Sequence, residues 1–300
     1  MAGRDRAAWD GGYEPHRAPA RQLARARTAF VFVHGAWHSS AQWAATLREL
    51  ARLGAAGYAV DLPGHGLDGP LPGGNLLPGQ PGLLTEKSPL ASGTMDECAE
   101  AVLETLRLTR HHNRVFLVAH SAGGGPAALA ARAGAGTRRR PRPPLRLRPR
   151  LPPPLPRLRR GARERHLPRP LPPSRRLRRT RRRTDNPLSP DPAYVEALRL
   201  TYHQDTPPDR FARWRAALGT DVPLAVPSTP VTLTAARWGS IPRTFLRCAD
   251  VQALTPAVQD LMIAETDRAV LARPFTVRTL PGGHSPFAAR PAELAAALLA

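Results

Sequence analysis

The sequence predicts an α/β fold in which helices cover both faces of a mostly parallel central sheet. Short, almost entirely apolar runs rich in β-branched and aromatic residues recur along the chain, as expected for strands that are buried on both faces. Stretches with helical spacing of apolar residues follow them, and this alternation is typical of a parallel sheet with helical crossovers. The 300 residues are enough for one sizeable core.

The individual elements follow from the same periodicities and from the turn formers between them. Strands are predicted at 28–34, 58–60, 114–119, 242–248 and 275–280. Helices are predicted at 41–53, 95–110, 126–132, 191–202, 208–218, 256–265 and 291–299. The strand at 114–119 runs directly into a glycine-rich turn and then a helix, which makes that corner the first place to look for a functional group.

One segment accounts for most of the unusual composition. The chain has a net charge of +21 and 35 prolines, and residues 137–184 alone hold 20 arginines, one glutamate and 12 prolines. This segment has neither helical nor strand periodicity, so we expect it to be disordered and to interrupt the fold. Arg-, Pro- and Leu-rich sequence is also what GC-rich DNA gives when it is read out of frame, and we hypothesise such a stretch here.

The concentration of positive charge in one segment limits the classes of partner. The rest of the chain is nearly neutral, and no aromatic residue interleaves the arginines between 138 and 183. Because single-strand binders stack bases on aromatic rings, no specific nucleic-acid partner is expected. No apolar run is long enough to cross a membrane, and no secretory signal is visible. Cys98 and Cys248 lack metal-ligand spacing, so we expect no metal and no cofactor, and a cytoplasmic location.

The expected organisation has five parts. Residues 1–27 form a disordered tail, and 28–136 the first part of the core. The Arg/Pro segment spans 137–184, a lid 185–240, and the second part of the core 241–300. The oligomeric state is not indicated by the sequence.

Ser121 is the predicted nucleophile. It lies in the run Ala119 to Gly123, which follows a buried strand and opens a helix. This is the setting of the nucleophile elbow G-x-S-x-G, here with alanine in the first position. The small residues on either side permit the sharp turn, which places the backbone N–H of Ala122 at the positive end of a helix. A chance serine in a glycine-rich turn is the competing reading.

The remaining members of the site come from loops after other strands. His284 lies in a Gly/Pro-rich loop near the C-terminus, where the general base belongs, and Asp250 follows the strand 242–248 as the candidate acid. The backbone N–H groups of Ala36 and Ala122 are the predicted oxyanion donors. Gly35, Trp37 and His120 are candidates for substrate binding. His34 is expected to hold loops by hydrogen bonds, and Asp250 could instead be a simple turn residue.

The combination of motifs resembles a known family. The runs at 32–38, 119–124, 241–248 and 283–287 look like those of bacterial α/β-hydrolases similar to pyrethroid-hydrolysing carboxylesterases, and to plant methyl esterases and hydroxynitrile lyases. The resemblance covers about 29–135 and 185–300. It implies an α/β-hydrolase fold with a small helical lid, and catalytic roles for Ser121 and His284. It also places the acid three positions after Cys248, where this chain has Val251.

Three functions remain open on this basis. The first is hydrolysis of small, fairly apolar carboxylic esters through an acyl-enzyme. The second is a catalytically impaired hydrolase fold that binds a ligand without cleaving it. Two features suggest it: the candidate acid Asp250 lies one position early, and the Arg/Pro segment interrupts the fold. The third is a hydroxynitrile-lyase-like reaction. Lyases resembling this family carry threonine at the position of Gly35 and lysine at that of Ser285, and both differences favour the esterase.

Overall fold

The computed structural model describes residues 27–71, 76–83, 85–134, 145–147, 176–177, 182–223, 225–270 and 273–300. Its central feature is a parallel sheet with the strand order β2-β1-β3-β4. The strands are Thr28–Val33 (β1), Ala56–Val60 (β2), Arg114–Ala119 (β3) and Leu145–Leu147 (β4). A parallel pair, Thr244–Cys248 (β8) and Thr276–Leu280 (β9), forms the second part of the core.

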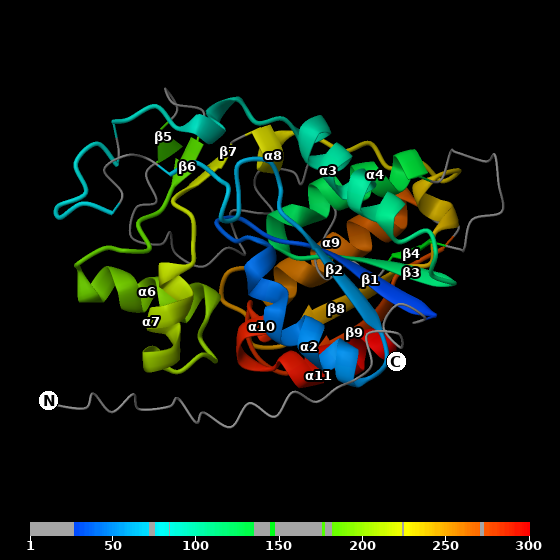
Figure 1. The fold of residues 1–300 in the computed structure, drawn as a ribbon. Helices are drawn as coiled ribbons and strands as arrows, with labels where there is room; N and C mark the ends of the chain where they lie inside the picture. The colour runs from blue at the N-terminus through cyan, green and yellow to red at the C-terminus, as the bar shows by residue number, and fades with distance from the viewer. Residues whose placement is uncertain are drawn as a thin grey trace, which may run out of the picture.

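Helices cover the four-stranded sheet on both faces, as the sequence predicted (Figure 1). Met95–Leu108 (α3) and Gly124–Gly134 (α4) pack together above it, and Ala44–Arg52 (α2) and Pro291–Leu299 (α11) pack together below it. Pro286–Ala289 (α10) lies beside α11, and Pro256–Ala269 (α9) follows β8.

Alternation along the strands sorts the core into two layers. In β1, Phe30 and Phe32 belong to one apolar cluster, whereas Val31 and Val33 belong to the other. Successive side chains of a strand point to opposite faces, so a run that is apolar at every position must be covered twice. The fully buried residues of β1 meet that demand, because the first cluster includes residues of α2 and α11 and the second includes residues of α3 and α4.

Local signals fix the helix ends. Thr94 caps α3: its hydroxyl accepts from the backbone N–H of Glu97, whose carboxylate accepts from the backbone N–H of Thr94. The predicted strands and helices are confirmed to within a few residues at most ends, the largest difference being α9, which runs four residues beyond the predicted end.

The Arg/Pro segment contributes more to the sheet than the sequence suggested. We expected this segment to be disordered and to interrupt the fold, but β4 lies within it and pairs in parallel with β3, Val115 opposite Leu145. Two further short strands, Arg176–Leu177 (β5) and Arg182–Thr184 (β6), form an antiparallel sheet with Asp221–Pro223 (β7). The disorder predicted for the rest of 137–184 lies outside the described residues.

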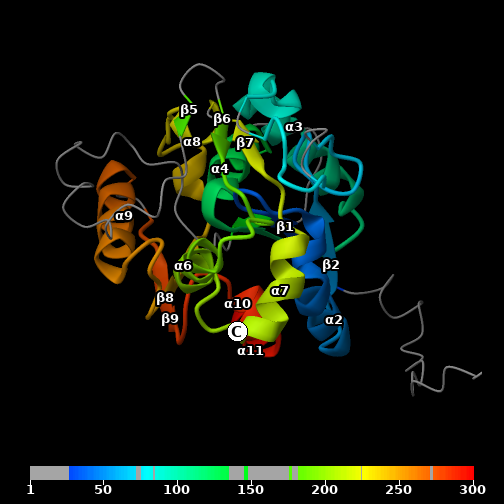
Figure 2. The same ribbon diagram turned by 90° about the vertical axis from the view of Figure 1, so that its left-hand side faces the viewer.

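The segment predicted as a lid contains two helices, Pro192–Tyr202 (α6) and Pro208–Ala216 (α7). Figure 2 shows them in front of the body of the sheet, with α10 beside them. A short helix, Ala225–Ser228 (α8), follows β7. No helix in the described ranges combines the length and the apolar character that crossing a bilayer requires.

Candidate active site

The corner after β3 has the strained backbone that a nucleophile elbow requires. Ser121 begins a short 3-10 turn, Ser121–Gly123, that leads into α4. Its φ is +49°, in the left-handed region that non-glycine residues rarely adopt. Such a conformation costs on the order of 1–3 kcal/mol and persists only where the surroundings hold it. The sharp turn predicted at this serine is therefore present, and its backbone is strained.

Two glycines let the backbone close around this corner. A Cβ on Gly123 would overlap the carbonyl oxygen of His34, at the end of β1. A Cβ on Gly35 would lie 2.8 Å from both the Cβ of Ser121 and the Nδ1 of His120. The loop after β1 thus passes directly against Ser121, as expected if this loop carries Ala36 as the predicted oxyanion donor.

Histidine side chains hold that loop in place. The Nδ1–H of His34 donates to the carbonyl of Gly35 (2.8 Å), and its Nε2 accepts from the backbone N–H of Leu62 (3.1 Å). The Nδ1–H of His38 donates to the carbonyl of Ala36 (2.7 Å). The expectation that His34 holds loops by hydrogen bonds is confirmed. His38, which the sequence analysis did not single out, does the same for the peptide that follows Ala36.

These histidines are kept neutral by burial. Desolvation lowers the pKa of His38 to about 4, against the hydrogen bond from its ring to Ala36. Desolvation, together with the nearby His65, holds the pKa of His34 well below its usual range. A neutral imidazole offers one donor and one acceptor, so the hydrogen bonds of His34 define which nitrogen carries its proton.

The loop that carries His284 meets the nucleophile corner. It connects β9 to α10, and the imidazole of His284 is buried. The Nε2–H of His120 donates to the carbonyl of His284 (2.9 Å), and the two ring centroids lie 4.7 Å apart. His120 is the residue directly before Ser121. Ser121, the predicted nucleophile, and His284, the predicted base, therefore belong to one cluster of side chains that His120 connects. The ring of Tyr202 lies 5.7 Å from those of His284 and Trp37 and closes the cluster on the side of α6.

The side chain of Asp250, the candidate acid, hydrogen-bonds to the backbone of the loop before His284. Asp250 is exposed, and its Oδ2 accepts from the backbone N–H of Gly282 (2.8 Å), two residues before the base. Val251, at the position where the family resemblance places the acid, is 3 % exposed and points its hydrocarbon side chain into the protein. The carboxylate of Asp250 therefore contacts the main chain of the base loop.

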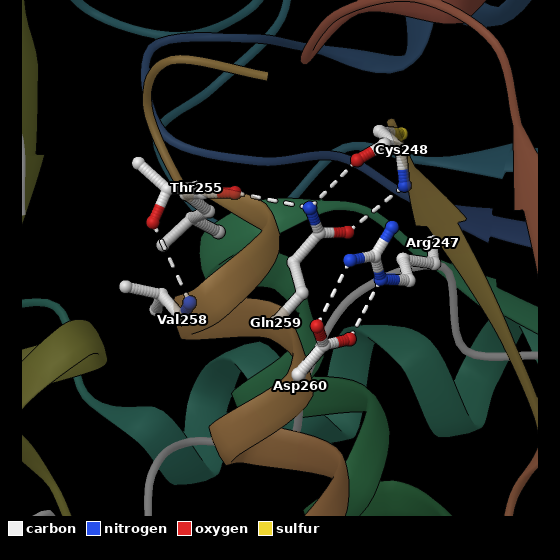
Figure 3. A network of polar contacts seen from close by, with 7 residues as sticks. Arg247, Cys248, Thr255, Val258, Gln259 and Asp260 are labelled. Carbon is white, nitrogen blue, oxygen red and sulfur yellow. Dashed lines mark hydrogen bonds and ion pairs between the residues drawn. The ribbon is translucent and has the colours of Figure 1, made fainter. Parts of the chain in front are cut away.

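A polar network holds the end of β8, two residues before Asp250 in the chain (Figure 3). The amide of Gln259, on α9, accepts from the N–H of Cys248 (2.9 Å) and donates to the carbonyls of Cys248 (2.9 Å) and Leu254 (3.1 Å). Gln259 has no exposed surface. Beside it, Arg247 and Asp260 form a two-pronged ion pair. The end of β8, which leads to Asp250, is thus held in place by residues of α9.

A pocket lies beside this cluster. Its walls come from the loop after β1, from α6 and from the segments around them: Trp37, His38, Asp185, Pro187, Leu198, Tyr202, His203, Leu218 and Gly219. Of the three residues predicted to bind substrate, Trp37 lines the pocket, Gly35 lies against Ser121, and His120 is buried and bridges to His284. Contact between any of them and a substrate stays a prediction.

The segment that connects α6 to α7 also reaches this cluster, although the sequence did not predict a role for it. His203 is 2 % exposed, and burial, helped by the nearby His38 and His284, lowers its pKa well below the usual value. The Oδ2 of Asp205 accepts from the backbone N–H of Gly283 (2.6 Å). The only signal was a short polar stretch between two predicted helices. Among the residues that the structure describes, no cluster of His, Cys, Asp and Glu could hold a metal ion.

Comparison with known families agrees with the fold. The model of the alpha/beta hydrolase family matches residues 30–297, nearly the whole chain. The chain belongs to the alpha/beta hydrolase family. No curated protein sequence matches this hydrolase.

Solved structures show the same fold over most of their length. A pyrethroid hydrolase matches 90 % of this hydrolase and 96 % of its own chain, with 22 % identity and a TM-score of 0.59. Polyneuridine aldehyde esterase matches 91 % of this hydrolase and 98 % of its own chain, with 16 % identity and a TM-score of 0.63. The methylesterase MES16 from Arabidopsis matches 91 % of this hydrolase and 97 % of its own chain, with 18 % identity and a TM-score of 0.55. The suspected family resemblance is confirmed at the level of the fold.

Proposed function

We propose that this hydrolase cleaves small, fairly apolar carboxylic esters through an acyl-enzyme on Ser121. The observation that carries the proposal is the arrangement at one corner: a serine with φ +49°, a glycine loop in contact with it, and the base loop bonded to its neighbour His120. The structural neighbours, which are named as a pyrethroid hydrolase and as esterases, support ester hydrolysis.

The chemistry follows from the roles of these groups. The neutral imidazole of His284 takes the proton of the Ser121 hydroxyl as the oxygen attacks the ester carbonyl. The N–H groups of Ala36 and Ala122 stabilise the oxyanion, and each such donor is worth about 100–1,000-fold in rate. The imidazolium then protonates the leaving alcohol, and water activated by His284 hydrolyses the acyl-enzyme.

The preference for apolar esters rests on the pocket. Trp37, Leu198 and Leu218 supply apolar surface beside the cluster, and burial keeps the lining histidines His38 and His203 neutral. The lining also contains one acidic side chain, that of the buried Asp185, so most but not all of the wall is uncharged. A hydroxynitrile-lyase-like reaction fits less well, because Gly35 and Ser285 stand where the lyases that resemble this family carry threonine and lysine.

A catalytically impaired binding protein is the second candidate. The observation in its favour is the exposed carboxylate of Asp250 next to the buried, apolar Val251. If the base is not oriented by a carboxylate, the rate can fall on the order of 10⁴-fold.

Two measurements test the proposal. p-Nitrophenyl butyrate hydrolysis by the full chain should disappear in Ser121→Ala, and a fluorophosphonate probe should label the wild type but not this variant. Ser92→Ala, at a serine far from the corner in sequence, is the control and should retain both signals. Equal hydrolysis by wild type and Ser121→Ala would refute the serine mechanism, and an unlabelled wild type would favour the binding protein.

A further inference from the structure

Two carboxylates bind consecutive backbone amides of the loop that carries the base. Asp250 accepts from the N–H of Gly282 (2.8 Å), and Asp205 accepts from the N–H of Gly283 (2.6 Å). Gly283 is the residue directly before His284, so the hydrogen bond of Asp205 acts one residue closer to the imidazole. Hydrogen bonds to a charged acceptor are roughly twice as strong as neutral ones.

The two carboxylates come from different parts of the fold. Asp250 follows β8 in the core and is exposed. Asp205 comes from the connection between α6 and α7, and its side chain is only 19 % exposed. The guanidinium of Arg290 lies 3.9 Å from its Oδ2. Because Asp205 is better shielded from water, its hydrogen bond competes less with solvent than that of Asp250.

The base loop and the α6–α7 connection are also packed against each other. A Cβ on Gly283 would lie 2.7 Å from the Cγ of Gln204, and a Cβ on Gly282 would overlap the carboxylate of Asp205. Gly282 has φ +94°, which a residue with a side chain would adopt only under strain. The amide of Gln204 donates to the carbonyl of Asp250 (2.5 Å). The connection thus contacts both the base loop and the loop after β8.

We infer that Asp205 is a positioning residue for His284, and that it takes over the orienting role which the resemblance assigns to the position of Val251. The inference rests on the proposed esterase function. The backbone of the base is held on both sides, by Asp205 at the N–H before it and by His120 at its own carbonyl. Fixing the backbone on both sides limits the directions in which the imidazole can point toward Ser121.

The test compares variants of the full chain with p-nitrophenyl butyrate. Asp205→Ala removes the acceptor, and we expect kcat to fall about 10–100-fold with KM changed less than about 3-fold, because displacement of a catalytic group by about 1 Å costs rates of this order. Asp205→Asn keeps an acceptor oxygen and should recover most of kcat, to within about 5-fold of wild type. Asp209→Ala removes an exposed carboxylate from the first turn of α7 and is the matched control.

The outcomes separate this inference from the proposed function. An Asp205→Ala variant whose kcat, per active site titrated with the fluorophosphonate, equals that of Asp209→Ala would overturn the positioning role while leaving the esterase intact. An Asp205→Asn variant that is as impaired as Asp205→Ala would also overturn it, because the retained acceptor should restore the hydrogen bond. A wild type that neither hydrolyses the ester nor reacts with the probe would overturn the proposed function and this inference with it.

Discussion

Acidification should destabilise the fold through the histidines buried in and around the loop that follows β1. His38 is the best-defined case, because desolvation lowers its pKa from 6.5 to about 4 and the residue is only 7 % exposed. Between these two pH values the unfolded chain binds a proton that the folded protein does not. Stability therefore rises with pH in this window and is lost as the pH falls from 6.5 toward 4.

The size of the effect follows from the pKa shift. One pKa unit corresponds to about 1.4 kcal/mol, so His38 alone should remove about 2 kcal/mol of stability between pH 7.5 and pH 5, and about 3 kcal/mol by pH 4. Burial also lowers the pKa values of His34, His65 and His203, which add to the loss in the same direction. For a protein of marginal stability this is a large fraction of the total.

The assay is urea unfolding of the full chain at pH 7.5, 6.5, 5.5 and 5, with the free energy of unfolding extrapolated to zero urea. His38→Gln should flatten the pH dependence by about 2 kcal/mol over this range, whatever its own stability at pH 7.5. His111→Gln, at an exposed histidine, is the control and should keep the wild-type dependence. A free energy that is constant from pH 7.5 to 5, or equal slopes for His38→Gln and wild type, would refute the reasoning.

Three further predictions concern single contacts. Gly35→Ala should lower kcat/KM about 100-fold or more, because its Cβ would lie 2.8 Å from that of Ser121. Gly54→Ala, at an exposed position just after α2 where a Cβ would meet nothing within 4 Å, should stay near wild type in the same ester assay. Gln259→Ala should lower the free energy of unfolding, measured in urea, by about 2–4 kcal/mol, because it leaves buried backbone groups without partners. Arg247→Ala removes a largely solvated ion pair and should lower it by less than about 1 kcal/mol. Thr94→Ala should lower the unfolding free energy by about 1 kcal/mol through loss of the helix cap; no change would argue against the capping box.

Much of the fold could be predicted because its signals are local. The unbroken apolar run of β1 requires cover on both faces, and the turn formers around Ser121 require a tight corner there. The pairing of β4 could not be predicted, because Leu145–Leu147 has no distinctive pattern and becomes a strand only through the free edge of β3. Edge pairing depends on main-chain groups, which every residue type except proline supplies.

The sequence by itself determined the layered fold, the strained corner at Ser121 and the loop that carries His284, because strand periodicity, small residues and turn formers act over a few neighbouring positions. Only the tertiary structure decided how that loop is held. The choice between Asp250, Val251 and Asp205 depends on which side chain is buried and which reaches a backbone amide far away in the sequence. A backbone N–H that donates a hydrogen bond leaves no trace in the residue type of the donating loop, so this contact had no signal in the sequence of the loop before His284.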